Sequence, residues 1–140
     1  MTIVEACESK TNTTPEFPMG WYSVARSNEL LVGEVKSVQA FDRELVLYRT
    51  RSGVPVIQDA YCPHLGAHLG VKGRVVGESI RCPFHGWRYG TDGMCEHIPY
   101  SDEIPDRARL RTWHCEEKNG EVYIWFHREN TGPQWELPSL

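Results

Sequence analysis

The 140-residue sequence lacks any apolar run of the roughly 20 residues that a helix needs to cross a bilayer. Its first ten residues, MTIVEACESK, contain neither the basic region nor the apolar region of a secretory signal peptide. We therefore expect a cytoplasmic protein with no membrane segment.

Basic residues are also scarce. The chain has 15 Lys and Arg against 19 Asp and Glu, which gives a formal net charge of −4. Domains that bind nucleic acid carry excess positive charge because they neutralise phosphates. The composition therefore predicts no nucleic acid partner, and it leaves a basic redox partner possible.

Cysteine occurs in a small and odd number, five residues. Without an export signal, this count argues against a disulfide scaffold and favours a reduced protein that holds a metal centre. Cys7 lies in a polar N-terminal stretch and is expected to be an exposed thiol. Cys95 and Cys115 lie in strand-like runs, where small buried thiols are common.

No segment has the length and the 3.6-residue period of a major helix. Short strand-like runs separated by polar turns recur instead, at residues 20–24, 35–40, 45–48, 54–57, 110–115 and 121–126. Asn119-Gly120 between the last two runs is the strongest hairpin signal in the chain. The pattern predicts an all-β fold, a small antiparallel barrel or sandwich.

The length and composition fit one domain with a sizeable core. We expect a flexible leader at 1–16, the main domain at 17–128 and an exit segment at 129–140. Within the main domain, residues of about 60–96 are expected to form an inserted subdomain of short strands, with one hairpin at 74–81 and another at 88–95.

Two loops of this subdomain place cysteine beside histidine. They read Cys62-Pro63-His64-Leu65-Gly66 and Cys82-Pro83-Phe84-His85-Gly86, and seventeen residues separate His64 from Cys82. Proline stiffens each loop by fixing φ, and glycine allows a tight turn. Two such loops can close around a [2Fe–2S] cluster, with Cys62 and Cys82 on one iron and His64 and His85 on the other.

Two other interpretations stay open. Two Cys and two His are also a zinc ligand set, although zinc sites usually pair like ligands, whereas here the two types are interleaved. The four side chains could instead be structural.

We expect no ligand role for His68, because the residues between it and His64 predict a loop rather than a helical turn. His97, His114 and His127 are expected to be surface or strand residues.

The four residues stand as the cluster ligands do in Rieske proteins. The run CPFHGWRYGTDGMC, with Trp87 after the second His-Gly pair, resembles the N-terminal domain of Rieske non-haem iron oxygenases. Cytochrome bc-type Rieske proteins carry an extra cysteine in each loop, and Ala67 and Phe84 stand at those positions here. GWYSVA, DGMC…IPY and GEVYIWFH are most similar to the steroid-acting branch, which includes the 3-ketosteroid 9α-hydroxylase oxygenase component and the Neverland-type cholesterol desaturase.

The resemblance implies one-electron transfer through a Rieske [2Fe–2S] cluster. It implies a reductase or ferredoxin as electron donor, an oxygenase mononuclear-iron domain as acceptor, and a homotrimer if the chain belongs to a full-length oxygenase. The mononuclear iron of such enzymes is held by two His and a carboxylate. No such triad is visible here, so we expect no oxygenation by the isolated chain. The alternatives are a stand-alone Rieske ferredoxin-like carrier and a zinc-stabilised binding module.

Overall fold

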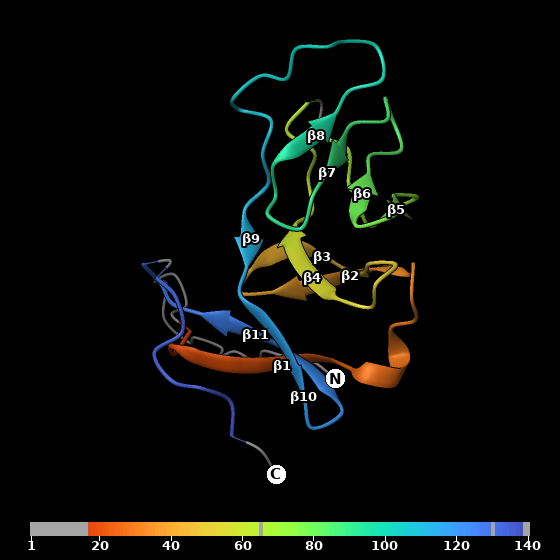
Figure 1. The fold of residues 1–140 in the computed structure, drawn as a ribbon. Helices are drawn as coiled ribbons and strands as arrows, with labels where there is room; N and C mark the ends of the chain where they lie inside the picture. The colour runs from red at the N-terminus through yellow and green to blue at the C-terminus, as the bar shows by residue number, and fades with distance from the viewer. Residues whose placement is uncertain (1–16, 65, 130, 139–140) are drawn as a thin grey trace.

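The computed structural model describes residues 17–64, 66–129 and 131–138. The leader predicted at 1–16, with Cys7, lies outside the described residues. The described part contains three antiparallel sheets and one short 3₁₀ turn, η1 (Ser27–Glu29) (Figure 1). No described helix has the length and apolar character needed to span a bilayer. The prediction of an all-β fold is confirmed.

The first sheet has the strand order β1-β11-β10. Its strands are β1 (Gly20–Arg26), β10 (Cys115–Lys118) and β11 (Glu121–Phe126). Asn119 and Gly120 join β10 to β11 with φ of 56° and 78°, the left-handed conformations that a tight Asn-Gly hairpin turn requires. The predicted hairpin is therefore confirmed.

The second sheet has the order β2-β3-β4-β9 and lies in the middle of the molecule (Figure 1). It comprises β2 (Val35–Ala40), β3 (Arg43–Arg49), β4 (Pro55–Asp59) and β9 (Thr112–Trp113). Successive side chains of a strand point to opposite faces. Leu45 and Leu47 of β3 accordingly pack in the core shared with the first sheet, and Val46 and Tyr48 pack in a second core on the other face.

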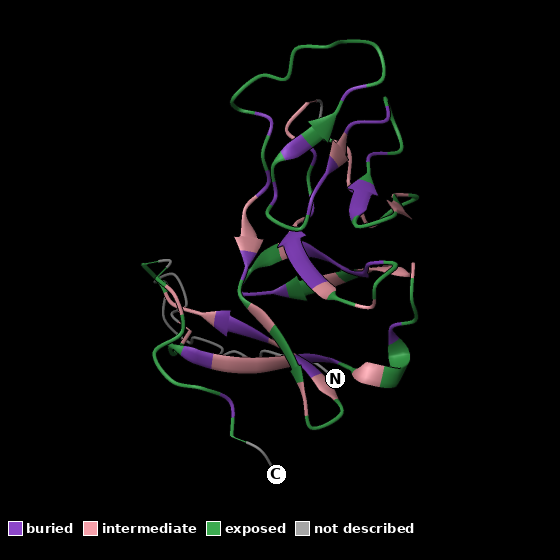
Figure 2. Ribbon diagram, in the orientation of Figure 1, coloured by how far each residue is buried: buried purple, intermediate pink, exposed green. Residues whose placement is uncertain are grey.

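The third sheet is inserted between β4 and β9 and packs over that second core. It comprises β5 (Arg74–Val76), β6 (Ser79–Arg81), β7 (Arg88–Tyr89) and β8 (Cys95–His97), paired in chain order. It lies at the end of the molecule away from β1, β10 and β11 (Figure 1 and Figure 2). The two hairpins predicted in this region are both present, as β5-β6 and β7-β8.

The run expected as one strand at 110–115 is divided, and that prediction was wrong. Trp113 ends β9, which pairs with β4, whereas Cys115 begins β10, which pairs with β11. Between them the carbonyl of His114 accepts a hydrogen bond of 3.0 Å from the N–H of Trp125. A strand that bends from one packed sheet into the next forms such a corner. The alternation of polar and apolar residues does not show which partner strand each half of this run pairs with.

Candidate metal centre

The first loop, residues 62–67, follows β4 and is closed by two backbone hydrogen bonds. The N–H of Cys62 donates to the carbonyl of Ala67 over 2.8 Å, and the N–H of Gly66 donates to the carbonyl of Cys62 over 2.7 Å. Gly66 has a φ of +79°, which costs an ordinary L-residue strain. The predicted tight turn is therefore present.

The second loop, residues 82–87, joins β6 to β7 and repeats the same two hydrogen bonds. The N–H of Cys82 donates to the carbonyl of Trp87 over 2.8 Å, and the N–H of Gly86 donates to the carbonyl of Cys82 over 3.2 Å. Gly86 also has a φ of +79°. The two loops thus share one backbone plan, and each fixes its cysteine at the base and its histidine nearer the tip.

The two thiols are buried and lie together. Cys62 is 1% exposed and Cys82 is 3% exposed, and both are free thiols. A hydrogen bond between the two sulfurs lowers the pKa of Cys62 to about 6, and the same contact raises the pKa of Cys82. Cys62 thus loses its own proton readily, and its thiolate accepts a hydrogen bond from the thiol of Cys82. An easily formed thiolate suits a group that binds a metal.

The two imidazoles also lie together, at the surface. The ring centroids of His64 and His85 are 5.0 Å apart, with His64 half-buried and His85 exposed. Among the described residues, no three His, Cys, Asp or Glu side chains surround a single point as the ligands of one metal ion would. The four predicted residues form two pairs instead, one of thiols and one of imidazoles.

Trp87 connects the two loops. Its indole stacks on the imidazole of His64, with centroids 4.2 Å apart and planes 8° from parallel, and it is only 4% exposed. Its Nε1–H donates a hydrogen bond of 2.7 Å to the hydroxyl of Tyr100. Trp87 therefore fills the core, as sequence reasoning allowed, and also covers one side of the histidine pair.

Sequence reasoning missed Tyr89. Its fully buried hydroxyl lies 3.1 Å from the sulfur of Cys62. Tyr89 points inward because it stands opposite Ile80 across β6 and β7, on the core face of the third sheet. A buried tyrosine needs a hydrogen-bond partner. That rule, applied to an inward-facing position of a strand, could have identified Tyr89.

His68, Cys95 and Cys115 have hydrogen-bond partners of their own outside these two pairs. Nε2 of His68 is 3.1 Å from a carboxylate oxygen of Glu44, and this hydrogen bond lowers the pKa of Glu44. The thiol of Cys95 donates to the carbonyl of His97, and that of Cys115 to the carbonyl of Pro55, each over 3.7 Å. Burial raises the pKa of both thiols, which makes them poor nucleophiles and metal ligands.

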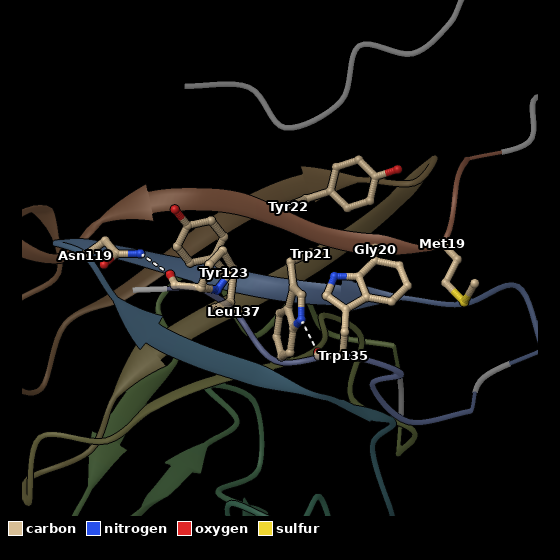
Figure 3. Close-up of a pocket in the computed structure, with 9 residues that line it drawn as sticks. Met19, Gly20, Trp21, Tyr22, Asn119, Tyr123, Trp135 and Leu137 are labelled. Atoms are coloured by element: carbon tan, nitrogen blue, oxygen red, sulfur yellow. Dashed lines mark hydrogen bonds between the residues drawn. The ribbon is translucent and has the colours of Figure 1, made fainter. Parts of the chain in front are cut away.

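A separate groove of about 430 Å³ lies on the first sheet (Figure 3). Trp21, Tyr123 and Trp135 contribute to its lining, and none of the four predicted ligands does. Residues 131–138 return to this sheet, where Nε1 of Trp21 donates to the carbonyl of Trp135 over 2.9 Å and Nζ of Lys118 donates to that of Leu137 over 2.7 Å. The groove is therefore a different feature from the paired loops.

Comparison with protein families gives one match that covers most of the chain. The family described as the Rieske [2Fe-2S] domain matches residues 20–114, which include both loops.

The chain is also similar to characterised sterol and steroid enzymes. It is 44% identical over 126 residues to cholesterol 7-desaturase nvd 1 of Ciona intestinalis, covering 90% of this chain and 27% of that protein. It is 38% identical over 121 residues to the 3-ketosteroid-9-alpha-monooxygenase oxygenase component of Rhodococcus rhodochrous, covering 86% of this chain and 31% of that protein. The chain thus spans about three tenths of these relatives' length.

The chain also superposes on solved structures of other enzymes. The QL mutant of NdmA from Pseudomonas putida CBB5 with theobromine superposes with a TM-score of 0.71 at 29% identity, over 78% of this chain and 34% of that one. Dicamba monooxygenase bound to dicamba gives a TM-score of 0.71 at 27% identity, over 84% of this chain and 35% of that one. The resemblance to Rieske oxygenases and to their steroid-acting branch is therefore confirmed. A domain of this kind carries a [2Fe–2S] cluster and transfers electrons through it, and the chain belongs to the Rieske [2Fe-2S] domain family.

Proposed function

We propose that Cys62, His64, Cys82 and His85 are the cluster ligands, with the two cysteines on one iron and the two histidines on the other. The observation that carries this assignment is the pairing of two buried thiols and two surface imidazoles by loops of one backbone plan. A rhombic two-iron cluster takes two protein ligands at each iron, so the donor set fits.

The same pairing argues against the zinc interpretation. A structural zinc ion takes four ligands in one tetrahedron. Here the donors separate into a buried sulfur pair and an exposed nitrogen pair, and no group of three donors in the described chain surrounds one point.

When bound, the cluster takes up and releases one electron, and the chain sets how readily it does so. Tyr89 aims its hydroxyl at the sulfur of Cys62, the core excludes water from both thiols, and Trp87 covers one face of His64. Hydrogen bonds to ligand sulfur raise the potential, because they stabilise the more negative reduced state. The exposed edge of His85 gives the site its contact with solvent.

We further infer that the chain is the electron-entry part of a Rieske oxygenase that acts on a sterol or steroid. Its relatives are named as cholesterol 7-desaturases and a 3-ketosteroid monooxygenase component, and they are about three times longer. The partners would be a reductase or ferredoxin that donates electrons and a mononuclear-iron domain that accepts them, in a homotrimer if the assembly follows the oxygenases. The isolated chain should convert no steroid.

Matched substitutions test the ligand assignment. Cys82→Ser and His85→Ala should each abolish the red-brown colour and the two irons and two acid-labile sulfides per chain. Cys95→Ser and His97→Ala, which change the same residue types close by in the third sheet, should retain them. Stoichiometric zinc without sulfide in the wild-type protein, or full cluster content in the ligand variants, would contradict the assignment.

A chimera tests the wider function. The matching segment of the Ciona intestinalis cholesterol 7-desaturase is replaced by this chain, and cholesterol desaturation is assayed with reductase and oxygen. We expect activity to be retained. A chimera that assembles both iron centres but is inactive would favour the stand-alone carrier instead.

A further inference from the structure

Three arginines form a continuous row across the third sheet. Arg74 stands directly opposite Arg81 between β5 and β6, and Arg81 stands directly opposite Arg88 between β6 and β7. His97 of β8 pairs with Arg88 at a point where the register between β7 and β8 shifts. Side chains at directly opposed positions lie on the same face of a sheet, so the row forms one basic stripe.

The stripe faces away from the core. Val75, Ile80 and Tyr89, which are the sequence neighbours of these three arginines, pack in the core between the second and third sheets. Arg74, Arg81 and His97 are exposed, and Arg88 is half-buried. The sheet therefore separates the buried thiol side of the site from an outer basic surface.

The positive charges of the stripe are not neutralised within the described chain. Three ion pairs occur among the described residues, and none of them involves Arg74, Arg81 or Arg88. Nε of Arg88 is buried without a hydrogen-bond partner. Like charges directly opposite each other destabilise a sheet, so this row does not stabilise the fold.

The stripe reaches the second loop. A Cβ built on Gly86 would lie 3.2 Å from Nη2 and 3.3 Å from Nε of Arg81, which places that guanidinium against the loop next to His85. Phe84, in the same loop, is 63% exposed. An exposed aromatic ring beside arginines is the composition of a protein-binding surface.

We propose that Arg74, Arg81 and Arg88, with Phe84 at the loop tip, form the docking surface for an electron-donor protein with an acidic binding face. This inference rests on the proposed function. A mobile donor must find the cluster by diffusion, and opposite charge raises the rate of such encounters. The net charge of −4 left a basic redox partner possible, but the local charge beside the second loop is positive and favours an acidic one.

The test measures reduction of the cluster-loaded chain by an acidic plant-type [2Fe–2S] ferredoxin in stopped flow. NaCl is varied from about 20 to about 500 mM, because added salt screens charge interactions. The wild-type rate constant should fall steeply with salt. Combined Arg74→Gln, Arg81→Gln and Arg88→Gln should lower it by about tenfold or more at low salt and flatten the salt dependence. Arg26→Gln, at an exposed arginine of the first sheet, is the control for loss of positive charge away from the stripe and should change the rate constant less than about twofold.

Three further readouts separate docking from a structural role. The triple variant should keep its cluster content, its potential and a Tm equal to or above the wild-type value, since like-charge repulsion is removed. Methyl viologen radical, a small cationic reductant, should reduce the triple variant at least as fast as wild type. Arg74→Glu alone, at the arginine of the row that lies farthest in sequence from the proposed ligands, should already slow the ferredoxin reaction. A cluster-loaded triple variant with the wild-type rate and salt dependence would overturn the docking proposal and leave the ligand assignment intact, whereas a wild-type chain without a cluster would overturn the proposed function itself.

Discussion

The imidazole of His64, in the first loop, lies flat against the indole of Trp87, at the end of the second loop. The loops come from distant parts of the third-sheet insertion, and this stack holds them together at the position proposed for the cluster. Trp87 is itself held by its hydrogen bond to Tyr100, which is 60% exposed. The geometry of the histidine pair therefore depends on side chains that are not ligands.

Removal of the Trp87 ring should weaken the site. Trp87→Ala leaves a cavity beside His64, and truncation of a buried Trp costs about 3–5 kcal/mol. We expect poor cluster incorporation and rapid bleaching of its visible absorption. Tyr100→Phe, which removes only the hydrogen-bond acceptor and leaves the stack, should bleach much more slowly. Equal bleaching rates in Trp87→Ala and wild type would show that the stack does not support the site.

The Tyr89 hydroxyl should raise the reduction potential. A bound sulfur becomes a better hydrogen-bond acceptor when the cluster gains an electron, so the bond is stronger in the reduced state. Tyr89→Phe should lower the potential by about 20–65 mV, the one-electron equivalent of a net hydrogen-bond energy of about 0.5–1.5 kcal/mol. Protein-film voltammetry measures this shift.

Tyr48 provides the control for Tyr89. It is fully buried in the same core, but its hydroxyl has no hydrogen-bond partner among the described residues. Tyr48→Phe should leave the potential unchanged, and it should not destabilise the fold, because an unsatisfied buried hydroxyl is removed. A shift of similar size in both variants would indicate a general effect of the core rather than a bond to sulfur.

The sequence predicted the two loops well because their signals are local. The Cys-Pro and His-Gly framing predicted two tight loops, and Gly66 and Gly86 have the left-handed φ that such turns need. The alternation of residues within a strand and the Asn119-Gly120 turn signal likewise depend only on residues that are close in sequence. These features allowed the all-β class, the hairpins and the four candidate residues to be identified.

Features that depend on pairing between distant strands could not be predicted. The break at His114 arises because one half of the run finds β4 and the other half finds β11. The arginine stripe appears only once the register sets Arg81 beside both Arg74 and Arg88. Alternation assigns residues to faces within a strand, but it does not give register across strands.

The two loop glycines should differ in their tolerance of a side chain. Both have a φ of +79°, so alanine at either position is strained by roughly 1–2 kcal/mol. At Gly66 a Cβ would meet no atom of the described part of the chain within 4 Å, whereas at Gly86 it would lie 2.9 Å from Cγ of Pro99. Gly86→Ala should therefore lower cluster occupancy and Tm more than Gly66→Ala. A larger loss of iron per chain in Gly66→Ala than in Gly86→Ala would contradict the view that the two loops share one backbone plan but differ in their surroundings.

Arg49 and Glu117 tie the first sheet to the second. Arg49 of β3 is 8% exposed, and its Nη1 and Nη2 donate to the two carboxylate oxygens of Glu117 of β10 over 2.9 and 2.8 Å. This bidentate contact lowers the pKa of Glu117, because it favours the charged carboxylate. The pair is partly open to solvent, so we expect Glu117→Gln to lower the free energy of unfolding by only about 1–2 kcal/mol at pH 7.

The advantage of Glu117 over glutamine should vanish in acid. The folded-state pKa of Glu117 is below its unfolded value, so the stabilisation is complete above an unfolded carboxyl pKa of about 4.3 and is lost as the pH falls through the folded-state value. Denaturant unfolding of wild type and Glu117→Gln at several pH values gives the difference directly, and acid effects on the cluster occur in both chains and cancel. Glu116→Gln, which changes the exposed neighbour on the other face of β10, should leave the free energy of unfolding at pH 7 within about 0.5 kcal/mol of the wild-type value. A difference between wild type and Glu117→Gln that grows as the pH falls below about 4 would have the wrong sign for a carboxylate held charged by Arg49.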